Sequence, residues 1–312
     1  MTAKIILGSR GSALALAQTR ETRERLMAAW PELRGDGAIE IRTVKTTGDV
    51  VRDRPLAELG GKGLFIKEVE GELLSGAIDA AVHSMKDMET TIADGTILAT
   101  VLPREDPRDA FISPHADSFE ALPQGARVGT ASVRRAALVL NRRPDLQVVM
   151  FRGNVDTRLR KLHDGEADAT FLAVCGLKRL EMEHAITRIM EPDAFPPPVS
   201  QGAIGVQCRD GNASARDADI ARWLSALDDA PSRARVTAER AMLAALDGSC
   251  RTPISGHAVL DGDRLTLSGL VLSLDGTQSH AGMASAAAGD AEALGRGVGE
   301  DILSRCGRGF LA

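Results

Sequence analysis

A repeated pattern of short apolar runs, polar turns and amphipathic helices constrains the fold of this chain more than any other feature. Lys4 to Leu7 is typical of a strand, and Ser12 after the next turn is a good N-cap for a helix over 13–29. The pattern returns further along, where a predicted strand ends at Gly129 and Ser132 precedes another helix. Strands that alternate with helices form α/β sheets. We therefore predict that the first two-thirds of the chain are α/β.

Two proline-rich segments, 103–109 and 195–202, interrupt this alternation and are predicted crossings between domains. About ninety residues separate them, which is a reasonable domain size. Beyond them a long helix over 232–246 is followed by strands, joined by Asp261-Gly262 and Asp275-Gly276, which are typical hairpin turns. We predict three domains: an α/β domain of residues 1–102 and 203–222, an inserted α/β domain of residues 103–202, and an α+β domain of residues 223–312.

Composition narrows the classes of function. The chain of 312 residues has a net charge of −5, which argues against a general nucleic-acid binder. Its four cysteines, 175, 208, 250 and 306, include no Cys-x-x-Cys pair and have no histidine at metal-ligand spacing, so we expect neither a disulfide framework nor a metal site. No apolar run is long enough for a signal-peptide core or a membrane span. We therefore expect a cytoplasmic protein and, without an extended apolar seam, a monomer.

Arginines gather just after the predicted strand ends. They lie in the turn after a strand or in the helix that follows it: Arg10, Arg134, Arg135, Arg152, Arg158 and Arg179. Helix N-termini favour anions through free N–H groups and the macrodipole, and arginine holds a carboxylate by two hydrogen bonds. One such arginine is ordinarily a solvated helix residue, but this explanation is hard to extend to six arginines at equivalent places in an acidic chain. We infer a cleft between two α/β domains that binds a ligand with several carboxylates or phosphates.

The stretch 80–87 places a carboxylate at one of these strand ends. Its apolar run turns polar at once with Ser84, Lys86 and Asp87. Ligands of open α/β sheets bind beyond the carboxyl ends of the strands, so Asp87 can face the cleft. There it could stabilise a cationic intermediate or accept a hydrogen bond from a ligand N–H. A salt bridge to one of the arginines explains Asp87 equally well, and we expect His83 to be structural.

Two further loops carry charged or reactive side chains. The glycine-rich loop 60–65 lacks the spacing of a phosphate-binding loop, and we expect it to bring Lys62 and Phe65 near a site. Cys250 follows a predicted helix end and has small and polar neighbours. An accessible thiol there could be a nucleophile or an attachment point, whereas we expect the other three cysteines to be small buried hydrophobes.

Together these residues closely resemble the porphobilinogen deaminase (hydroxymethylbilane synthase) family over nearly the whole chain. The resemblance is carried by an ordered set of motifs: Arg10-Gly11-Ser12, Gly60 to Phe65, His83 to Asp87, Arg104 to Phe111, Arg134-Arg135, Arg152 to Val155, Gly176 to Arg179, Gln201 to Ala203 and Gly248 to Cys250. Each motif alone is weak, but the ordered set is very specific. Ala131, Glu89 and Ser200 depart from the usual family pattern. None of these departures replaces the predicted carboxylate, thiol or arginines.

The resemblance implies a fold of two periplasmic-binding-protein-like α/β domains with a cleft between them, plus a small C-terminal α+β domain. It implies a transferase that joins four porphobilinogen molecules head to tail, with loss of ammonia at each step. The chain grows on a dipyrromethane cofactor, held by a thioether to Cys250, and hydroxymethylbilane is released by hydrolysis. Porphobilinogen is then the expected small-molecule partner, in the biosynthesis of porphyrins and heme.

The same resemblance implies roles for individual residues. By this resemblance Asp87 would be the catalytic carboxylate. The cofactor would be held by Cys250, Ser84, Lys86, Asp87, Thr130, Ser132, Arg134, Arg135 and Arg158, and the substrate by Arg10, Ser12, Lys62, Phe65, Arg152, Asn154, Arg158, Arg179 and Gln201. From the residues alone, two other classes stay open: a non-catalytic two-lobed binding protein for an organic anion, and a cysteine-dependent transferase for another acidic substrate.

Overall fold

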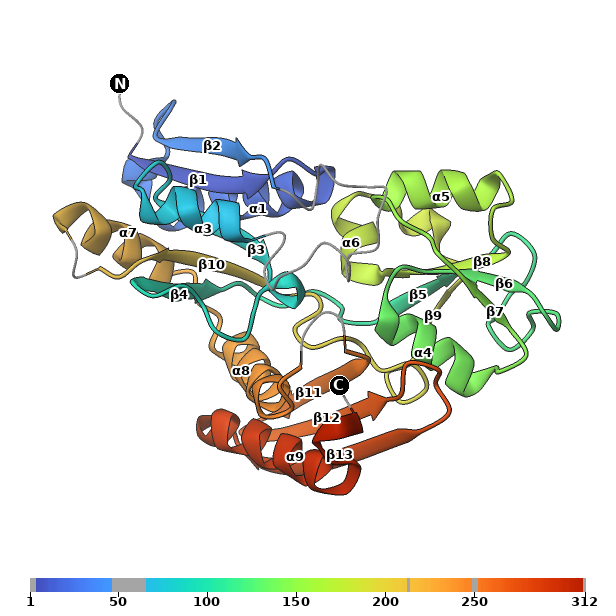
Figure 1. The fold of residues 1–312 in the computed structure, drawn as a ribbon. Coiled ribbons are helices and arrows are strands. Elements are labelled where there is room, and N and C mark those ends of the chain that lie inside the picture. The colour runs from blue at the N-terminus through green and yellow to red at the C-terminus, as the bar shows by residue number, and fades with distance from the viewer. Residues whose placement is uncertain (1–3, 47–65, 212–213, 249–251, 311–312) are drawn as a thin grey trace. The chain divides into compact units, whose positions relative to one another are not determined.

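The computed structural model describes residues 4–46, 66–211, 214–248 and 252–310. The chain forms two compact units, which we call unit 1 (residues 1–105 and 203–233) and unit 2 (residues 106–202 and 234–312). The chain leaves unit 1 within the first proline-rich segment and returns to it at the end of the second (Figure 1). The further division of the chain into three domains stays a prediction.

Unit 1 is built on a five-stranded sheet in the order β2-β1-β3-β10-β4. Its strands are β1 (Ile5–Arg10), β2 (Ile39–Val44), β3 (Ala80–Ser84), β4 (Thr96–Val101) and β10 (Ile204–Arg209). β1 pairs in parallel with β2 and β3, whereas β10 runs antiparallel to both β3 and β4. A strand from a distant part of the chain therefore separates two strands that are consecutive in the sequence.

Helices cover both faces of this sheet. They are α1 (Ala13–Ala29), α3 (Lys67–Leu74) and α7 (Ala215–Ser225). Leu26 of α1 and Leu224 of α7 belong to one apolar core with Val82 of β3. Leu73 of α3 belongs to a second core with Ala81, on the opposite face of the same strand. Because β3 is buried on both faces, its apolar run is continuous rather than alternating.

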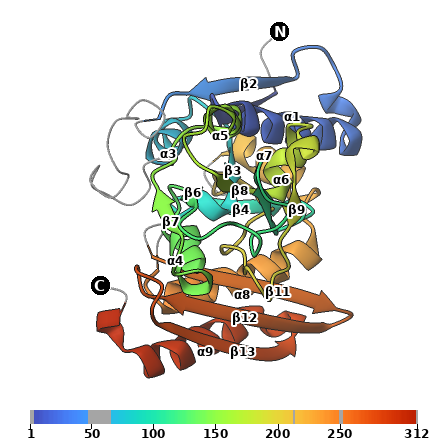
Figure 2. The same ribbon diagram turned by 90° about the vertical axis from the view of Figure 1, so that its right-hand side faces the viewer.

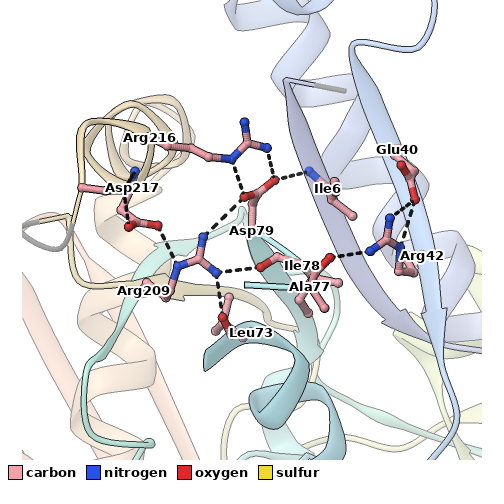
Figure 3. A network of polar contacts seen from close by, with 11 residues as sticks. Ile6, Glu40, Arg42, Leu73, Ala77, Ile78, Asp79, Arg209, Arg216 and Asp217 are labelled. Carbon is pink, nitrogen blue, oxygen red and sulfur yellow. Dashed lines mark hydrogen bonds and ion pairs between the residues drawn. The ribbon is translucent and has the colours of Figure 1, made fainter. Parts of the chain in front are cut away.

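A polar network fixes the amino-terminal end of β3 (Figure 3). Asp79 is 3% exposed, and its carboxylate accepts hydrogen bonds from the Ile6 N–H at 2.8 Å and from Arg216 at 2.7 and 2.8 Å. Arg209 lies 3.4 Å from the same carboxylate and donates to Asp217 at 2.7 Å. Buried charges are tolerated where they are paired and hydrogen-bonded. This network, which we call the Asp79 network, therefore ties β1, β10 and α7 to the start of β3.

The first part of unit 2 repeats the plan of unit 1, with a sheet in the order β7-β6-β8-β5-β9. Its elements are β5 (Asp109–Ile112), β6 (Arg127–Gly129), α4 (Val133–Arg142), β7 (Gln147–Val149), α5 (Val155–His163), β8 (Ala169–Ala173), α6 (Val174–Arg179) and β9 (Arg188–Ile189). β6 is parallel to β7 and β8, and β5 is antiparallel to β8 and β9. In both sheets one antiparallel strand thus lies next to a parallel group of three.

The C-terminal part of unit 2 is a three-stranded antiparallel sheet, β11-β12-β13, with two helices on one face (Figure 2). Its elements are α8 (Ala230–Ala245), which begins in unit 1, β11 (Ile254–Asp261), β12 (Arg264–Leu272), β13 (Ser279–Ala287) and α9 (Ala291–Cys306). Met242 of α8 and Ile302 of α9 belong to one apolar core with the strands. Gly262 and Gly276 have φ angles of 57° and 73°, and both predicted hairpins are confirmed.

The turn between β12 and β13 lies directly against α4. Asn141 Nδ2 donates a hydrogen bond to the Gly276 carbonyl at 2.8 Å. A Cβ atom at Gly276 would lie 2.6 Å from the carbonyl oxygen of Ala137 and 2.7 Å from the backbone nitrogen of Asn141. Glycine is required here both for the positive φ and for the close approach to the helix. The turn of the C-terminal sheet therefore packs against α4, the helix that begins after Ser132.

Candidate active site

A pocket lies at the carboxyl ends of β1 and β3 in unit 1. It is lined by Arg10, Ser12, Leu14, Ala15, Gln18, Ile66, Val82, His83, Ser84, Lys86 and Asp87. Five predicted site residues, Arg10, Ser12, Ser84, Lys86 and Asp87, are thus brought together. This edge of the sheet is where open α/β folds bind ligands.

Asp87 ends a short 3₁₀ turn, η2 (Met85–Asp87), that directly follows β3. The turn is anchored by Met85, which is 1% exposed and whose N–H donates to the Ala203 carbonyl at 3.1 Å. Asp87 itself is exposed. Within the described part of unit 1, its carboxylate has no ion-pair partner. Within this part of the chain, Asp87 is therefore not held by a structural salt bridge, and its carboxylate can reach a ligand.

Two hydroxyl groups of the pocket are oriented by neighbouring groups. Gln18 of α1, which is 4% exposed, donates from Nε2 to Ser84 Oγ at 3.2 Å. Ser12 is the predicted N-cap of α1, and its Oγ accepts a hydrogen bond from the Ala15 N–H at 3.2 Å. Because each oxygen accepts one of these bonds, each O–H remains able to donate. Both hydroxyls therefore suit an anionic group of a ligand.

His83 lines the pocket as a neutral imidazole. Its Nε2 lies 3.1 Å from Gln207 Oε1, and it is 6% exposed. Gln207 Nε2 donates to Glu70 Oε1 at 2.9 Å and to Thr96 Oγ1 at 2.7 Å, so Gln207 Oε1 accepts and His83 Nε2 carries the hydrogen. Burial lowers the pKa of His83 to about 4. The expectation of a structural histidine agrees with these contacts, and His83 adds no charge near neutral pH.

Ser132 is the N-cap of α4 in unit 2, and it contacts Thr130, another predicted site residue. Its Oγ accepts from the Arg135 N–H at 3.4 Å, and its own N–H donates to Thr130 Oγ1 at 3.1 Å. The free N–H groups of a first helical turn and the macrodipole give this end a partial positive charge. Thr130 and Ser132 therefore lie at a helix end that favours anions.

Asp109 holds both arginines of this helix. Its carboxylate is fully buried, and it accepts from Arg134 Nη2 at 2.6 Å and from Arg135 Nη2 and Nε at 2.7 and 3.2 Å. Gln201 Nε2 donates to Asp109 Oδ1 at 2.9 Å. One carboxylate thus fixes three predicted site residues from the start of β5. We call these four residues the Asp109 cluster.

The Asp109 cluster carries a surplus positive charge. The side chains of Arg134 and Arg135 are 4% and 7% exposed. Burial alone would raise the pKa of Asp109, but the Arg135 and Arg134 cations hold it well below its usual range. Burial, together with the Arg135 cation, lowers the pKa of Arg134 in spite of Asp109. Two guanidinium cations and one carboxylate leave one buried positive charge without a partner. Burial of such a charge costs free energy unless an anion binds to it.

The remaining predicted residues of unit 2 lie around α5 and α6. Asn154 caps α5, since its Oδ1 accepts from the Thr157 N–H at 2.9 Å. Arg152 precedes this cap and Arg158 lies in the helix, and both are half-buried. Arg179 ends α6 and donates to the Gly202 carbonyl at 3.2 Å.

Lys62, Phe65 and Cys250 lie outside the described residues, and their predicted roles stay predictions. Among the residues that the structure does describe, no group of His, Cys, Asp and Glu could hold a metal ion. Sequence patterns assigned no role to Gln18, Asp109 or Gln207. Asp109 lies within the motif Arg104 to Phe111, and Gln18 and Gln207 are polar side chains within or beside an apolar run, but neither signal says what partner the side chain contacts.

The pocket and the Asp109 cluster belong to a chain with clear relatives. The family model described as "Porphobilinogen deaminase, dipyromethane cofactor binding domain" matches residues 5–217, more than half of the chain. The chain belongs to the porphobilinogen deaminase family. The model of the C-terminal domain of the same family matches residues 233–304. The chain therefore matches both models of this family, including the one for the domain that binds the dipyrromethane cofactor.

Curated relatives of the chain are named porphobilinogen deaminase. The one from Nitrobacter hamburgensis is 52% identical over 309 residues, which cover 98% of this chain and 94% of the relative. The one from Paracoccus denitrificans is 53% identical over 307 residues, which cover 98% of this chain and 96% of the relative. Among solved structures, the methionine-binding protein MetQ aligns with a TM-score of 0.44 and 11% identity, over 72% of this chain and 89% of that one.

The residues at the start of α4 fit a dipyrromethane cofactor of this family. Its carboxylate side chains need cationic partners, and the Asp109 cluster has a surplus of one positive charge. The Nε of Arg134 is buried and has no hydrogen-bond partner among the described residues. Buried donors are nearly always satisfied, so an exception needs an explanation such as a ligand. Elsewhere in the described part of the chain, no helix is long and apolar enough to cross a membrane.

Proposed function

We propose that Asp87 is the catalytic carboxylate of this porphobilinogen deaminase and that Cys250 carries its dipyrromethane cofactor through a thioether. The family reaction joins four porphobilinogen molecules head to tail with loss of ammonia and releases hydroxymethylbilane by hydrolysis. The observation that supports Asp87 is its position: an exposed carboxylate just past the end of β3, in one pocket with Arg10 and Lys86.

Asp87 acts on the charge that develops when ammonia leaves. Loss of ammonia from porphobilinogen leaves a cation, and a fixed carboxylate nearby stabilises that charge in the transition state. Asp87 also accepts a hydrogen bond from a pyrrole N–H and assists proton transfer to the leaving amine. His83 does not compete for this role, because burial lowers its pKa to about 4 and keeps it uncharged.

The arginines hold the acetate and propionate groups of the substrate. Those proposed to do so are Arg10 with Ser12 in unit 1, and Arg152, Arg158 and Arg179 with Asn154 in unit 2. A guanidinium group binds a carboxylate through two parallel hydrogen bonds, which fixes the orientation of the pyrrole as well as its position. Lys62, Phe65 and Gln201 join this set on the family resemblance.

A second set of residues is proposed to hold the cofactor: Ser84, Lys86, Asp87, Thr130, Ser132, Arg134, Arg135 and Arg158. When bound, the cofactor supplies the pyrrole to which the first porphobilinogen is joined. By holding its carboxylates, these residues keep that pyrrole close to Asp87. Each coupling then occurs between groups that are already oriented, which raises their effective concentration.

We also propose the architecture in which this chemistry takes place. Residues 1–102 with 203–222 and residues 103–202 form the two α/β domains of this proposal, and residues 223–312 carry the cofactor thiol. We expect the protein to act as a cytoplasmic monomer. Its net charge of −5 supports the expectation that it binds no nucleic acid.

The role of Asp87 is tested by Asp87→Asn, with Asp94→Asn as the control. Both carboxylates are exposed and both belong to unit 1, but Asp94 does not line the pocket. Asp87→Asn should fold normally and consume porphobilinogen at least about 10²-fold more slowly, because it loses electrostatic stabilisation and proton transfer. Asp94→Asn should keep the wild-type rate. Near-normal turnover by Asp87→Asn would refute the role.

The attachment to Cys250 is tested by the intact mass of the purified chain. The wild-type protein should exceed the mass of its sequence by two pyrrole units, and Cys250→Ser should show the mass of the bare chain. Cys306→Ser, which removes a half-buried cysteine of α9, should keep the excess. Active wild-type protein with a bare mass would overturn the cofactor proposal, and an excess that survives Cys250→Ser would place the attachment elsewhere.

A further inference from the structure

Two buried carboxylates in this chain each gather two guanidinium groups. Asp79 is 3% exposed and binds Arg216 and Arg209 in unit 1, and Asp109 is 0% exposed and binds Arg134 and Arg135 in unit 2. Both carboxylates also accept a hydrogen bond from a neutral N–H group. The two sites therefore use the same chemistry to hold cations, and they can be compared directly.

The Asp79 network is balanced in charge. Arg209 binds a second carboxylate, Asp217, at 2.7 Å, so two cations face two anions (Figure 3). Arg216 is also 47% exposed in its side chain, and water can solvate it. Such a network stabilises the fold without requiring any further group.

The Asp109 cluster is not balanced. Both of its arginine side chains are more than nine-tenths buried, and no second carboxylate of the described residues bonds either of them. Their remaining hydrogen bonds are to backbone carbonyls, from Arg134 Nη1 to Pro196 at 2.7 Å and from Arg135 Nη1 to Phe171 at 2.8 Å. The Arg134 guanidinium also lies 5.9 Å from the centroid of the Phe195 ring. The Nε of Arg134 is buried and lacks an acceptor in the described part of the chain. These features are costly unless an anion is bound nearby.

The position of the cluster agrees with an anion site. Arg134 and Arg135 lie in the first turn of α4, a helix of 10 residues whose N-cap is Ser132. The helix macrodipole adds to the surplus charge at this end. Asp109 fixes the guanidinium groups from outside the helix, since it lies at the start of β5.

We propose that Asp109 is a positioning residue for the cofactor site. It sets the direction of the Arg134 and Arg135 guanidinium groups and cancels one of their two charges, so that the pair binds about one carboxylate group. Two close guanidinium groups without a shared anion would repel each other and lose their fixed geometry. This inference rests on the proposed function, in which both arginines hold the carboxylates of the dipyrromethane.

Three variants of the full chain test this inference: Asp109→Asn, Asp109→Glu and, as the matched control, Asp79→Asn. Asp79→Asn also removes a buried carboxylate from two guanidinium groups, so it reproduces the loss of stability alone. Each variant is purified as folded protein, and the fraction of chains that carry the two-pyrrole excess is measured by intact mass. The KM and kcat for porphobilinogen are then measured per loaded chain.

Asp109→Asn should lower the loaded fraction of folded chains by about tenfold or more, the factor expected for one lost charge-assisted hydrogen bond. Asp109→Glu keeps the charge but shifts the guanidinium groups, so its loaded fraction should lie between those of Asp109→Asn and the wild type. Asp79→Asn should load like the wild type, with unchanged KM and kcat per loaded chain. A merely structural role of Asp109 predicts equal loading of folded Asp109→Asn and Asp79→Asn, and that result would overturn the inference.

Two further outcomes are decisive. If Asp109→Asn does not fold, Asp109→Glu decides, because it retains the ion pairs: wild-type loading of this variant would overturn the positioning role, and reduced loading would support it. If the wild-type chain itself carries no mass excess, the proposed function fails before any variant is compared. The failure of the proposed function and the failure of the inference are thus distinguishable.

Discussion

The buried imidazole of His83 should make unit 1 sensitive to mild acid. An unfolded histidine has a pKa of about 6.5, whereas burial lowers the pKa of folded His83 to about 4. The unfolded state therefore binds the proton first as the pH falls. The stability that comes from neutral His83 is complete above pH 6.5 and is lost between pH 6.5 and 4. Proton linkage with these two values gives a loss of about 2 kcal/mol at pH 5 relative to pH 7.5.

This loss can be measured in unit 1 alone. Both tryptophans of the chain, Trp30 and Trp223, lie in unit 1, so urea unfolding followed by tryptophan fluorescence reports on that unit. Ordinary Asp and Glu side chains have pKa values of about 3.9 and 4.3, so carboxylates of the unfolded chain bind few protons at pH 5 and contribute little to the change above it. The free energy of unfolding of the wild type should therefore fall by about 2 kcal/mol between pH 7.5 and 5.

A variant and its control separate His83 from other causes. His83→Gln should be less stable than the wild type at pH 7.5, but its free energy of unfolding should fall by less than about 0.5 kcal/mol at pH 5. His184→Gln changes an exposed histidine and should keep the wild-type loss. If the wild type and His83→Gln lost equal stability in acid, the burial argument would be wrong.

Two further predictions concern α4. Ser132→Ala removes the N-cap of this helix and should cost about 1 kcal/mol in the free energy of unfolding of unit 2, measured by circular dichroism in urea; an unchanged value would contradict the capping role. Gly276→Ala places a Cβ 2.6 Å from the Ala137 carbonyl oxygen at a φ of 73°, and should cost about 2 kcal/mol or more by the same measurement. Its control is Gly262→Ala, which has a φ of 57° but open space around the Cβ and should cost only about 1 kcal/mol; equal losses would mean that contact with α4 adds nothing.

Local signals in the sequence were sufficient for most of the elements. Ser12 and the helix after it were predicted with the bounds that the structure has, and the N-cap residue that marks the start of this helix is a local signal. Both hairpins of the C-terminal sheet follow from their Asp-Gly pairs for the same reason. β5 was missed, because it begins at Asp109 within a segment rich in proline and charge.

The chemistry of the site was predicted less completely than the fold. The motif around Asp87 identified an exposed carboxylate at a strand end, and the structure places it in a pocket with Arg10. The same reasoning placed Arg134 and Arg135 at a helix N-terminus, but it could not predict that they would be buried against Asp109. That contact joins residues 25 and 26 positions apart, and no local pattern specifies which carboxylate an arginine will meet.

The place of β10 in the first sheet has a consequence for synthesis on the ribosome. Residues Ile204–Arg209 separate β3 from β4, so that sheet cannot be completed until more than two-thirds of the protein has been made. The strands of the inserted sheet, from Asp109 to Ile189, have all emerged earlier. The nascent polypeptide can therefore form the sheet of its middle portion before β10 has been synthesised. During that interval the edges of β3 and β4 that later pair with β10 are exposed and can pair with a wrong strand.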